Sequence, residues 1–307
     1  MTLKEYYLPY LNRLYDDLLF RQVILSYNLR YSLVDKNGNA KPIFKNKSLK
    51  ELFKRIFFRQ LEEAEKTLLL LKKVNFSKKE FLLEIGGGLG FTFGYLKNQG
   101  YKIFSLEPSQ KEYQGSYSAA RRMLQIMKIP HIHWFPYCAS EANKINQKFD
   151  IIFSNNVIEH IPDLELTFKS LKSVLKKDGI MIHNTVNYLI PYEPHFRIFL
   201  FPFFPKLTTL IYKNLKGISS FKEINFINPI VLSRLAKTDD FIIKFHQGTL
   251  ADTLKRLETD KSFMLKHKNI LPIYRLVKKI GLIKIIRKLP PFITTPLEFT
   301  IEHNPST

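Results

Sequence analysis

Cysteine is nearly absent from this chain of 307 residues, in which Cys138 is the only one. A single thiol excludes any disulfide within the chain, which favours a reducing compartment and a cytoplasmic location. No stretch reaches the roughly 20 consecutive apolar residues that a membrane-spanning helix needs. The first residues, MTLKEYY, also lack the apolar core of a signal peptide. We therefore expect neither a membrane span nor export by a cleaved leader.

Acidic residues are scarce as well. The chain has 27 Asp and Glu against 48 Lys and Arg, which gives a formal net charge of +21. Such an excess of positive charge attracts polyanions, and the two candidates are nucleic acid and the headgroups of anionic lipids. Hydrophobic residues make up 45% of the sequence, enough for a large core in one domain or two small ones.

Glycine is uncommon too, yet four of the five residues 86–90 are glycine, directly after the apolar run Phe81–Ile85. Glycine accepts positive φ angles and has no side chain, so the backbone can turn sharply after a strand and approach a ligand closely. A pyrophosphate site would need a further glycine where Phe91 stands. The carboxylate of Glu84 would repel a phosphate but suits a ligand that carries an ammonium and a sulfonium. This pattern favours S-adenosylmethionine over NAD.

The pattern Glu84-x-Gly86-x-Gly88-x-Gly90 resembles the first motif of the class I (Rossmann-like) S-adenosylmethionine-dependent methyltransferases. Two later segments agree with it. Residues 101–107 indicate a second strand that ends in an acid, Glu107, and residues 148–163 are similar to the fourth-strand motif of the same family. The resemblance covers mainly residues 80–187.

The resemblance also implies which residues hold the cofactor. Glu107 would bind the ribose, and Asn155 and Asn156 would lie beside the methionine moiety. The family commonly has an Asp near the adenine, which this chain lacks, so backbone contacts near Cys138 and Ala139 would hold the base instead. The full expected set is Glu84, Gly86, Gly87, Gly88, Gly90, Glu107, Cys138, Ala139, Asn155 and Asn156.

The rhythm of apolar runs predicts an α/β fold with a doubly wound seven-stranded sheet whose last strand is antiparallel. We expect a turn at residues 177–179 to close the helix before the fifth strand. The expected strands are 81–85, 103–107, 132–135, 151–155, 180–186, 241–245 and 297–301, and the helices of this part are 91–98, 115–128 and 164–175.

The chain is expected to divide into an N-terminal helical segment, residues 1–75, and a methyltransferase domain, residues 76–307. Helical spacing of apolar residues runs over 3–30 and 48–72, with a turn at 35–39 between them. We expect these helices to pack near the mouth of the cofactor site or at an adjacent edge.

Two insertions depart from the minimal core. The first, about 187–220, is interrupted by prolines and rich in phenylalanine, which predicts short turns and an apolar lid. The second, about 251–293, carries nine Lys and Arg and no acid between Lys261 and Lys288, interleaved with isoleucine and leucine. A basic amphipathic helix of this kind is typical of a membrane surface. The same pattern also permits the apolar stripe to pack on the core.

An apolar lid beside basic helices suits an amphipathic small-molecule acceptor, lipid-linked or glycan-type, at the inner face of an anionic membrane. Nucleic acid is disfavoured because the aromatic residues form an apolar run without polar groups for bases. RNA methylation remains an alternative function, as does a non-catalytic module that keeps the fold to bind a membrane or a partner. The oligomeric state is left open.

Candidate catalytic residues follow from a methyl transfer to oxygen, which needs a base if the acceptor is an alcohol. His160 follows the fourth strand, and Glu193 and His195 lie on the lid, where closure could bring them to the acceptor. Each of them could instead have a purely structural role. No metal site is expected, because Asn156 stands where related metal-dependent methyltransferases have the first carboxylate of a Glu-x-x-Glu-His cluster.

Overall fold

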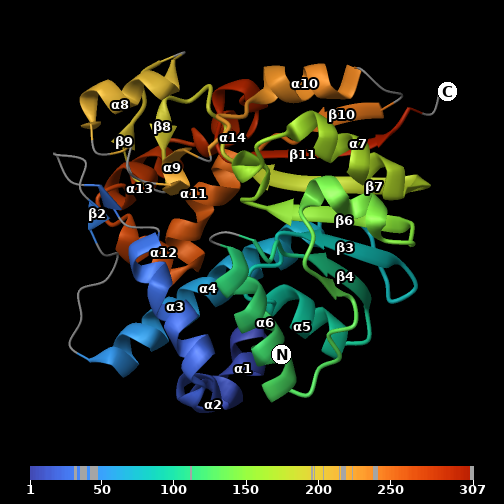
Figure 1. The fold of residues 1–307 in the computed structure, drawn as a ribbon. Coiled ribbons are helices and arrows are strands. Elements are labelled where there is room, and N and C mark those ends of the chain that lie inside the picture. Colours follow the sequence, from blue (N-terminus) through green and yellow to red (C-terminus); the bar gives the residue numbers. More distant parts are fainter. Residues whose placement is uncertain are drawn as a thin grey trace.

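The computed structural model describes residues 1–30, 33–34, 40–41, 48–110, 113–194, 196, 198–202, 204–213, 215, 219–222, 224–237 and 241–304. The turn expected at 35–39 and the candidate residue His195 lie outside these residues. A seven-stranded sheet forms the centre of the molecule, in the order β10-β11-β7-β6-β3-β4-β5 (Figure 1). Its strands are β3 Phe81–Ile85, β4 Lys102–Leu106, β5 Trp134–Phe135, β6 Phe149–Asn155, β7 Leu175–Thr185, β10 Phe241–Phe245 and β11 Leu297–His303.

The five strands from β5 to β7 are parallel, and β11 pairs antiparallel with both β7 and β10. The predicted doubly wound α/β sheet with an antiparallel last strand is therefore confirmed. Because parallel strands end at the same edge, the residues that follow β3, β4 and β6 meet at the carboxyl edge of the sheet.

Two hydrophobic cores lie on the two faces of this sheet. Neighbouring residues of β3 divide between them: Leu82 joins the core shared with the N-terminal helices, and Leu83 joins the core on the opposite face. This alternation follows from the period of two in a strand. The helices on the two faces are α5 Phe91–Asn98 and α6 Gln114–Ile126 on one, and α7 Leu164–Val174 and α10 Pro229–Lys237 on the other (Figure 1).

The N-terminal segment contains the helices α1 Leu3–Tyr7, α2 Leu11–Asp16, α3 Leu18–Arg30 and α4 Leu49–Leu71. The expectation of one helical run over 3–30 was wrong at two places. Pro9 lies in a 3-10 turn, and Asp17 is extended, with its Oδ1 accepting the N–H of Phe20 at 2.9 Å. These helices pack on α5 and α6: the Tyr7 hydroxyl donates to the Phe91 carbonyl at 2.7 Å.

The turn expected at 177–179 was also wrong. Helix α7 ends at Val174 and β7 begins at Leu175 without an intervening loop. Leu175 pairs with Phe149, whereas Ile180 pairs with Ile151, so the extra residues form an irregularity inside the strand. Lys176 stabilises this stretch, because its Nζ lies 2.7 and 2.8 Å from the two carboxylate oxygens of Asp150 on β6.

The two insertions fold into short elements. The first holds the hairpin β8 Tyr192–Glu193 and β9 Ile198–Phe199, then α8 Thr208–Ile211 and α9 Ser219–Lys222; the second holds α11 Thr249–Thr259, α12 Lys261–Lys266, α13 Leu271–Lys279 and α14 Ile283–Arg287. The side chain of Asn187 joins their ends, since Nδ2 donates to the carbonyls of Pro291, Phe292 and Thr294 at 2.9–3.1 Å. Within the described part of the chain, none of the helices has the length and apolarity required to cross a membrane.

Candidate active site

The glycine turn, residues 86–90, lies at the carboxyl end of β3 between β4 and β6. Three of its glycines have positive φ: +71° at Gly86, +57° at Gly88 and +76° at Gly90. The N–H groups of Gly86 and Gly87 both donate to the Leu106 carbonyl, at 2.9 and 3.1 Å. The turn is therefore fixed to the end of β4 through backbone bonds, in conformations that favour glycine.

Gly87 and Gly88 have opposite surroundings. A Cβ at Gly87 would lie 2.2 Å from the Ser105 Oγ and 2.5 Å from the Trp134 ring, so Gly87 faces the packed interior. A Cβ at Gly88 would meet no atom within 4 Å. Gly88 thus leaves open space beside exposed backbone, which is the kind of cradle that a nucleotide-type cofactor requires.

Glu107 lies beside this open space. Its side chain is only 4% exposed, and its Oε2 accepts the N–H of Gly88 at 2.9 Å. The bond joins the residue after β4 to the turn after β3. The structure therefore brings together Gly88 and Glu107, two of the expected cofactor residues, although they are 19 residues apart.

Glu84 lies beneath the turn. It is buried, accepts the Ser105 hydroxyl at 3.2 Å, and has Thr92 as a second hydrogen-bonding neighbour. Burial raises the pKa of Glu84 to about 8, with a smaller contribution of the same sign from Glu107, whereas the bonds from Thr92 and Ser105 lower it. The described contacts of Glu84 are thus with the protein interior, where it supports the turn.

The end of β6 forms the other side of the site. Asn184 Nδ2 donates to Asn155 Oδ1 at 2.7 Å, and the N–H of Asn156 donates to the Asn184 carbonyl at 2.9 Å. Asn156 has a φ of +54°, which asparagine tolerates better than most residues. The next residue, Val157, packs against the turn, since a Cβ at Gly86 would lie 2.6 Å from its Cγ2. The two strand ends are therefore in contact.

Cys138 and Ala139 follow β5 at the same edge of the sheet. The Phe135 carbonyl at the end of β5 accepts the N–H of Glu107 at 3.1 Å. Cys138 is half-buried, and its N–H donates to Glu141 Oε2 at 2.9 Å, whereas Ala139 is buried. The bond from Glu107 fixes the end of β5, three residues before Cys138, beside the end of β4.

His160 lies on the 3-10 helix η4, Ile158–His160, and is half-buried. Asn225 holds this helix in place, because its Nδ2 donates to the carbonyls of Ile158 at 2.7 Å and Ile161 at 2.9 Å. Asn225 is 67 residues from Ile158 along the chain, and nothing in the local sequence marks the two as partners.

Glu193 is fully buried rather than displayed on a lid surface. It accepts a hydrogen bond from the Tyr188 hydroxyl, and burial, followed by the charges of Glu193 and Glu159, raises the pKa of Tyr188 far above its ordinary value. Glu159 is buried too and accepts the Thr185 hydroxyl at 2.8 Å. Sequence reasoning missed Thr185 and Tyr188, although polar residues at and just beyond the end of an apolar strand were a usable signal.

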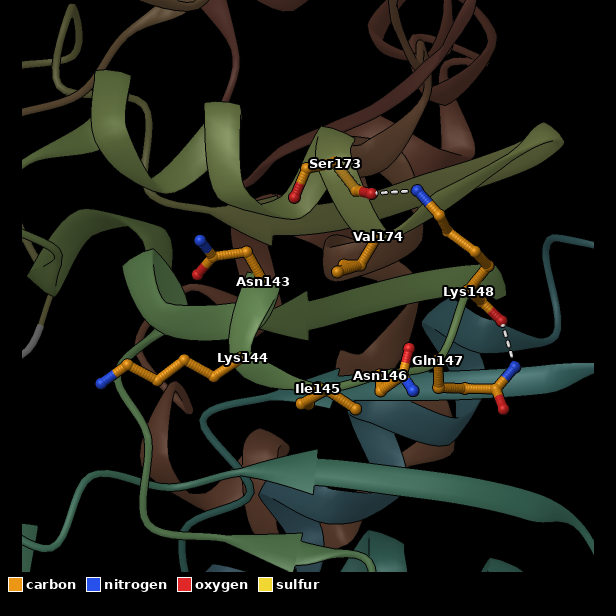
Figure 2. Close-up of a pocket in the computed structure, with 8 residues that line it drawn as sticks. All are labelled: Asn143, Lys144, Ile145, Asn146, Gln147, Lys148, Ser173 and Val174. Atoms are coloured by element: carbon orange, nitrogen blue, oxygen red, sulfur yellow. Dashed lines mark hydrogen bonds between the residues drawn. The ribbon is translucent and has the colours of Figure 1, made fainter.

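No group of three or more metal-ligating side chains occurs among the residues that the structure describes. An open pocket of about 510 Å³ is lined by residues 143–148, Ser173 and Val174. Figure 2 shows these side chains. Residues 143–148 precede β6, so this pocket lies at the amino edge of the sheet, opposite the glycine turn. It contains none of the predicted site residues.

Comparison with known proteins agrees with this arrangement. Residues 33–212 match the model of a family described as a methyltransferase domain. An uncharacterized protein of Mycobacterium tuberculosis is 29% identical over 193 residues, which cover 59% of this chain and 64% of that protein. A ubiquinone biosynthesis O-methyltransferase of Pelagibacter ubique is 26% identical over 159 residues, covering 50% of this chain and 59% of that protein.

Among solved structures, the O-methyltransferase from a trans-AT polyketide synthase of Brevibacillus brevis, in complex with S-adenosyl-L-homocysteine, has a TM-score of 0.48 and 13% identity. That match covers 83% of this chain and 76% of the other. The matches to the Mycobacterium tuberculosis and Pelagibacter ubique proteins each span less than two thirds of the length of those relatives.

Proposed function

The chain belongs to the S-adenosylmethionine-dependent methyltransferases, and from this premise we propose that it methylates an oxygen of a small amphipathic acceptor, lipid-linked or glycan-type. The observation that carries the donor half is the open space at Gly88, bordered by the buried carboxylate of Glu107. A phosphate would be repelled by this carboxylate, whereas ribose hydroxyls donate to it.

The residues around the turn fit the family's cofactor. When bound, S-adenosylmethionine supplies an electrophilic methyl group on a sulfonium centre. Glu107 would accept hydrogen bonds from the ribose, Asn155 and Asn156 would contact the methionine moiety, and the backbone near Cys138 and Ala139 would contact the adenine. The glycines of the turn, Gly86, Gly87, Gly88 and Gly90, keep the backbone close to the cofactor, and Glu84 supports them from below.

The acceptor is proposed to bind at the same edge, between η4 and the first insertion. His160 is the proposed base and takes the proton of the acceptor hydroxyl on an imidazole nitrogen. Glu193, which binds the Tyr188 hydroxyl in a buried position, is the alternative base. His195, on the lid, is the third proposed catalytic residue. The similarity to the ubiquinone biosynthesis O-methyltransferase of Pelagibacter ubique supports oxygen as the acceptor atom.

The amphipathic character of the acceptor is inferred from the first insertion. Phe199 and Phe204 are 74% and 63% exposed, which leaves aromatic surface of the first insertion available to an apolar acceptor. We also propose that the chain consists of an N-terminal helical segment, residues 1–75, and a methyltransferase domain, residues 76–307. They share one core, since Tyr7 and Phe57 pack with Phe91.

Calorimetric titration with S-adenosylmethionine and S-adenosylhomocysteine tests the donor site. We expect micromolar binding to the natural chain and none to Gly88→Arg, because the new side chain fills the cradle. Gly281→Arg is the matched control: Gly281 also has a positive φ, +78°, and a Cβ there would meet no atom within 4 Å, but it lies between α13 and α14.

If Gly281→Arg loses binding as Gly88→Arg does, or the natural chain binds neither compound, the donor site is refuted. The non-catalytic module then becomes the better hypothesis. Once binding is established, incubation with labelled donor and lipid-linked or glycan acceptors tests the acceptor class. Labelling of RNA, with a steep dependence on salt, would contradict the proposed acceptor instead.

A further inference from the structure

We propose that α13 and α14 form a docking surface for an anionic lipid bilayer. The docking surface consists of exposed apolar side chains and of the cations between them. The apolar residues are Ile273, Leu276, Ile280 and Ile285, and the cations are Arg275, Lys279 and Lys284. Docking itself is independent of methyl transfer, whereas its value for catalysis, the delivery of a lipid-like acceptor, rests on the proposed function.

The apolar stripe of α13 faces outward. Ile273, Leu276 and Ile280 follow the spacing i, i+3, i+7 of one helical face, and they are 62%, 59% and 58% exposed. Tyr274 lies on another face of the helix and is 4% exposed. Val277, Ile283 and Ile286 are half-buried, so the core takes up one side of the apolar stripe and leaves Ile273, Leu276 and Ile280 exposed on the other.

Helix α14 and the turn after it also have exposed apolar side chains. Ile285 is 59% exposed, and beyond it Phe292 and Ile293 are 41% and 56% exposed. A run of exposed apolar side chains over two helices and the following turn is unusual for a surface that only water contacts. An amphipathic helix in a bilayer interface places such side chains among the acyl chains.

The charges of this region fit a negatively charged surface. Two of the cations hold the helices on α11: Lys278 pairs with Glu258 and Arg287 pairs with Asp252, both at 2.7 Å. Throughout the part of the chain that the structure describes, no salt bridge joins Arg275, Lys279 or Lys284 to a carboxylate. These three cations remain available for lipid headgroups.

The first insertion carries exposed apolar side chains of its own. Phe199 of β9, Phe204, and Leu210 and Ile211 of α8 are all exposed. In Figure 1, α8, β9 and α13 lie to the left of the sheet. Asn187 binds the carbonyls of residues 291, 292 and 294, so the first insertion begins where the second one ends. Both segments thus extend from one point of the molecule.

Aliphatic side chains together with cations favour a bilayer over RNA. Single-stranded nucleic acid stacks on aromatic rings, whereas the exposed stripe of α13 is isoleucine and leucine. Lipid provides both an apolar phase for these side chains and phosphate groups for Arg275, Lys279 and Lys284.

Vesicle co-sedimentation tests the docking surface with the full chain and without donor or acceptor. One set of vesicles is pure phosphatidylcholine, and the other contains about one third phosphatidylglycerol, enough to give a strongly negative surface potential. The apolar variant carries Ile273→Ser, Leu276→Ser and Ile280→Ser. The charge variant carries Arg275→Gln, Lys279→Gln and Lys284→Gln. The control, Lys54→Gln with Lys169→Gln and Lys177→Gln, removes the same charge from exposed lysines elsewhere.

We expect the natural chain to bind the anionic vesicles only, the apolar and charge variants to bind them at least tenfold more weakly, and the control to bind like the natural chain. If the control lost as much vesicle binding as the charge variant, net charge alone would explain the attraction and the proposal would be overturned. Full binding by the apolar variant would overturn it too, since a site for polyanions such as RNA needs no apolar stripe.

Far-UV circular dichroism of each variant checks that it is folded. The donor titration with Gly88→Arg is a separate measurement, so vesicle binding and cofactor binding succeed or fail independently.

Discussion

The glycine turn and helix α13 face solvent in different ways. The turn presents backbone, in φ angles from +57° to +76° that few other residues adopt, and its side-chain neighbours are buried. Helix α13 presents side chains on an ordinary helical backbone. Its outward residues, Ile273, Leu276 and Ile280, are exposed to solvent. A short motif can specify the first kind of surface, whereas the second depends on composition that many sequences share. The donor is therefore well defined and the acceptor is not.

The largest effect is expected from adding a methyl group inside the turn. Gly87→Ala places a Cβ 2.2 Å from Ser105 Oγ and should lower the free energy of unfolding by about 3 kcal/mol or more. In Gly88→Ala the new Cβ meets no atom within 4 Å. The free energy of unfolding should fall by only roughly 1–2 kcal/mol, because alanine disfavours the left-handed conformation. Urea unfolding measures both. Equal losses in the two variants would contradict the opposite surroundings of these neighbouring glycines.

A second test uses the buried carboxyl group under the turn. The folded chain keeps Glu84 protonated up to a pKa of about 8, whereas its ordinary value is 4.5. The folded state therefore binds the extra proton between these values, and the contribution of Glu84 to the free energy of unfolding falls as pH rises through this window. Glu84→Gln should remove this fall. Exposed Glu165→Gln should keep it, and urea unfolding at pH 5 and pH 8 decides between them.

The junction of the two insertions should show an intermediate effect. Asn187→Ala removes three side-chain bonds to backbone carbonyls in a buried position and should destabilise the chain by about 2–3 kcal/mol. Asn269→Ala, at an exposed position, is the control. Thermal unfolding compares the two, and an Asn187→Ala variant as stable as the control would mean that the ends of the insertions are not held together by this residue.

The smallest effect is expected on the docking surface. Leu276→Ser removes an exposed leucine and should change the free energy of unfolding by no more than about 0.5 kcal/mol. The same substitution at Leu83, which is fully buried in β3, should cost several times more, because about 2–5 kcal/mol is lost when a core leucine is truncated. If Leu276→Ser were as harmful as Leu83→Ser, α13 would be packed rather than exposed.

Much of the sheet was predictable from the sequence, because buried parallel strands are short apolar runs and the turn after β3 needs glycine. The antiparallel last strand was predicted correctly as well. The start of β7 was not, because Lys177-Asp178-Gly179 has the composition of a turn while Leu175 pairs with Phe149. That pairing depends on a distant strand, so local composition cannot reveal it.

The candidate site divides in the same way. The bond from Gly88 to Glu107 follows from adjacent parallel strands, and the motif predicted both residues. The bond from Tyr188 to Glu193 and the contacts of Asn225 with η4 depend on how the first insertion folds back. No periodic pattern encodes such contacts, because each joins single residues in irregular segments. The burial of Glu193 was missed for this reason.

The position of β11 bears on the order in which the molecule is made. It lies between β7 and β10, although it follows both along the chain and comes after the second insertion. A nascent chain emerging from a ribosome therefore has β10 without a paired strand, and β7 with an open edge, until residues 297–303 leave the exit tunnel. During that interval the basic helices are already synthesised while the central sheet is still incomplete.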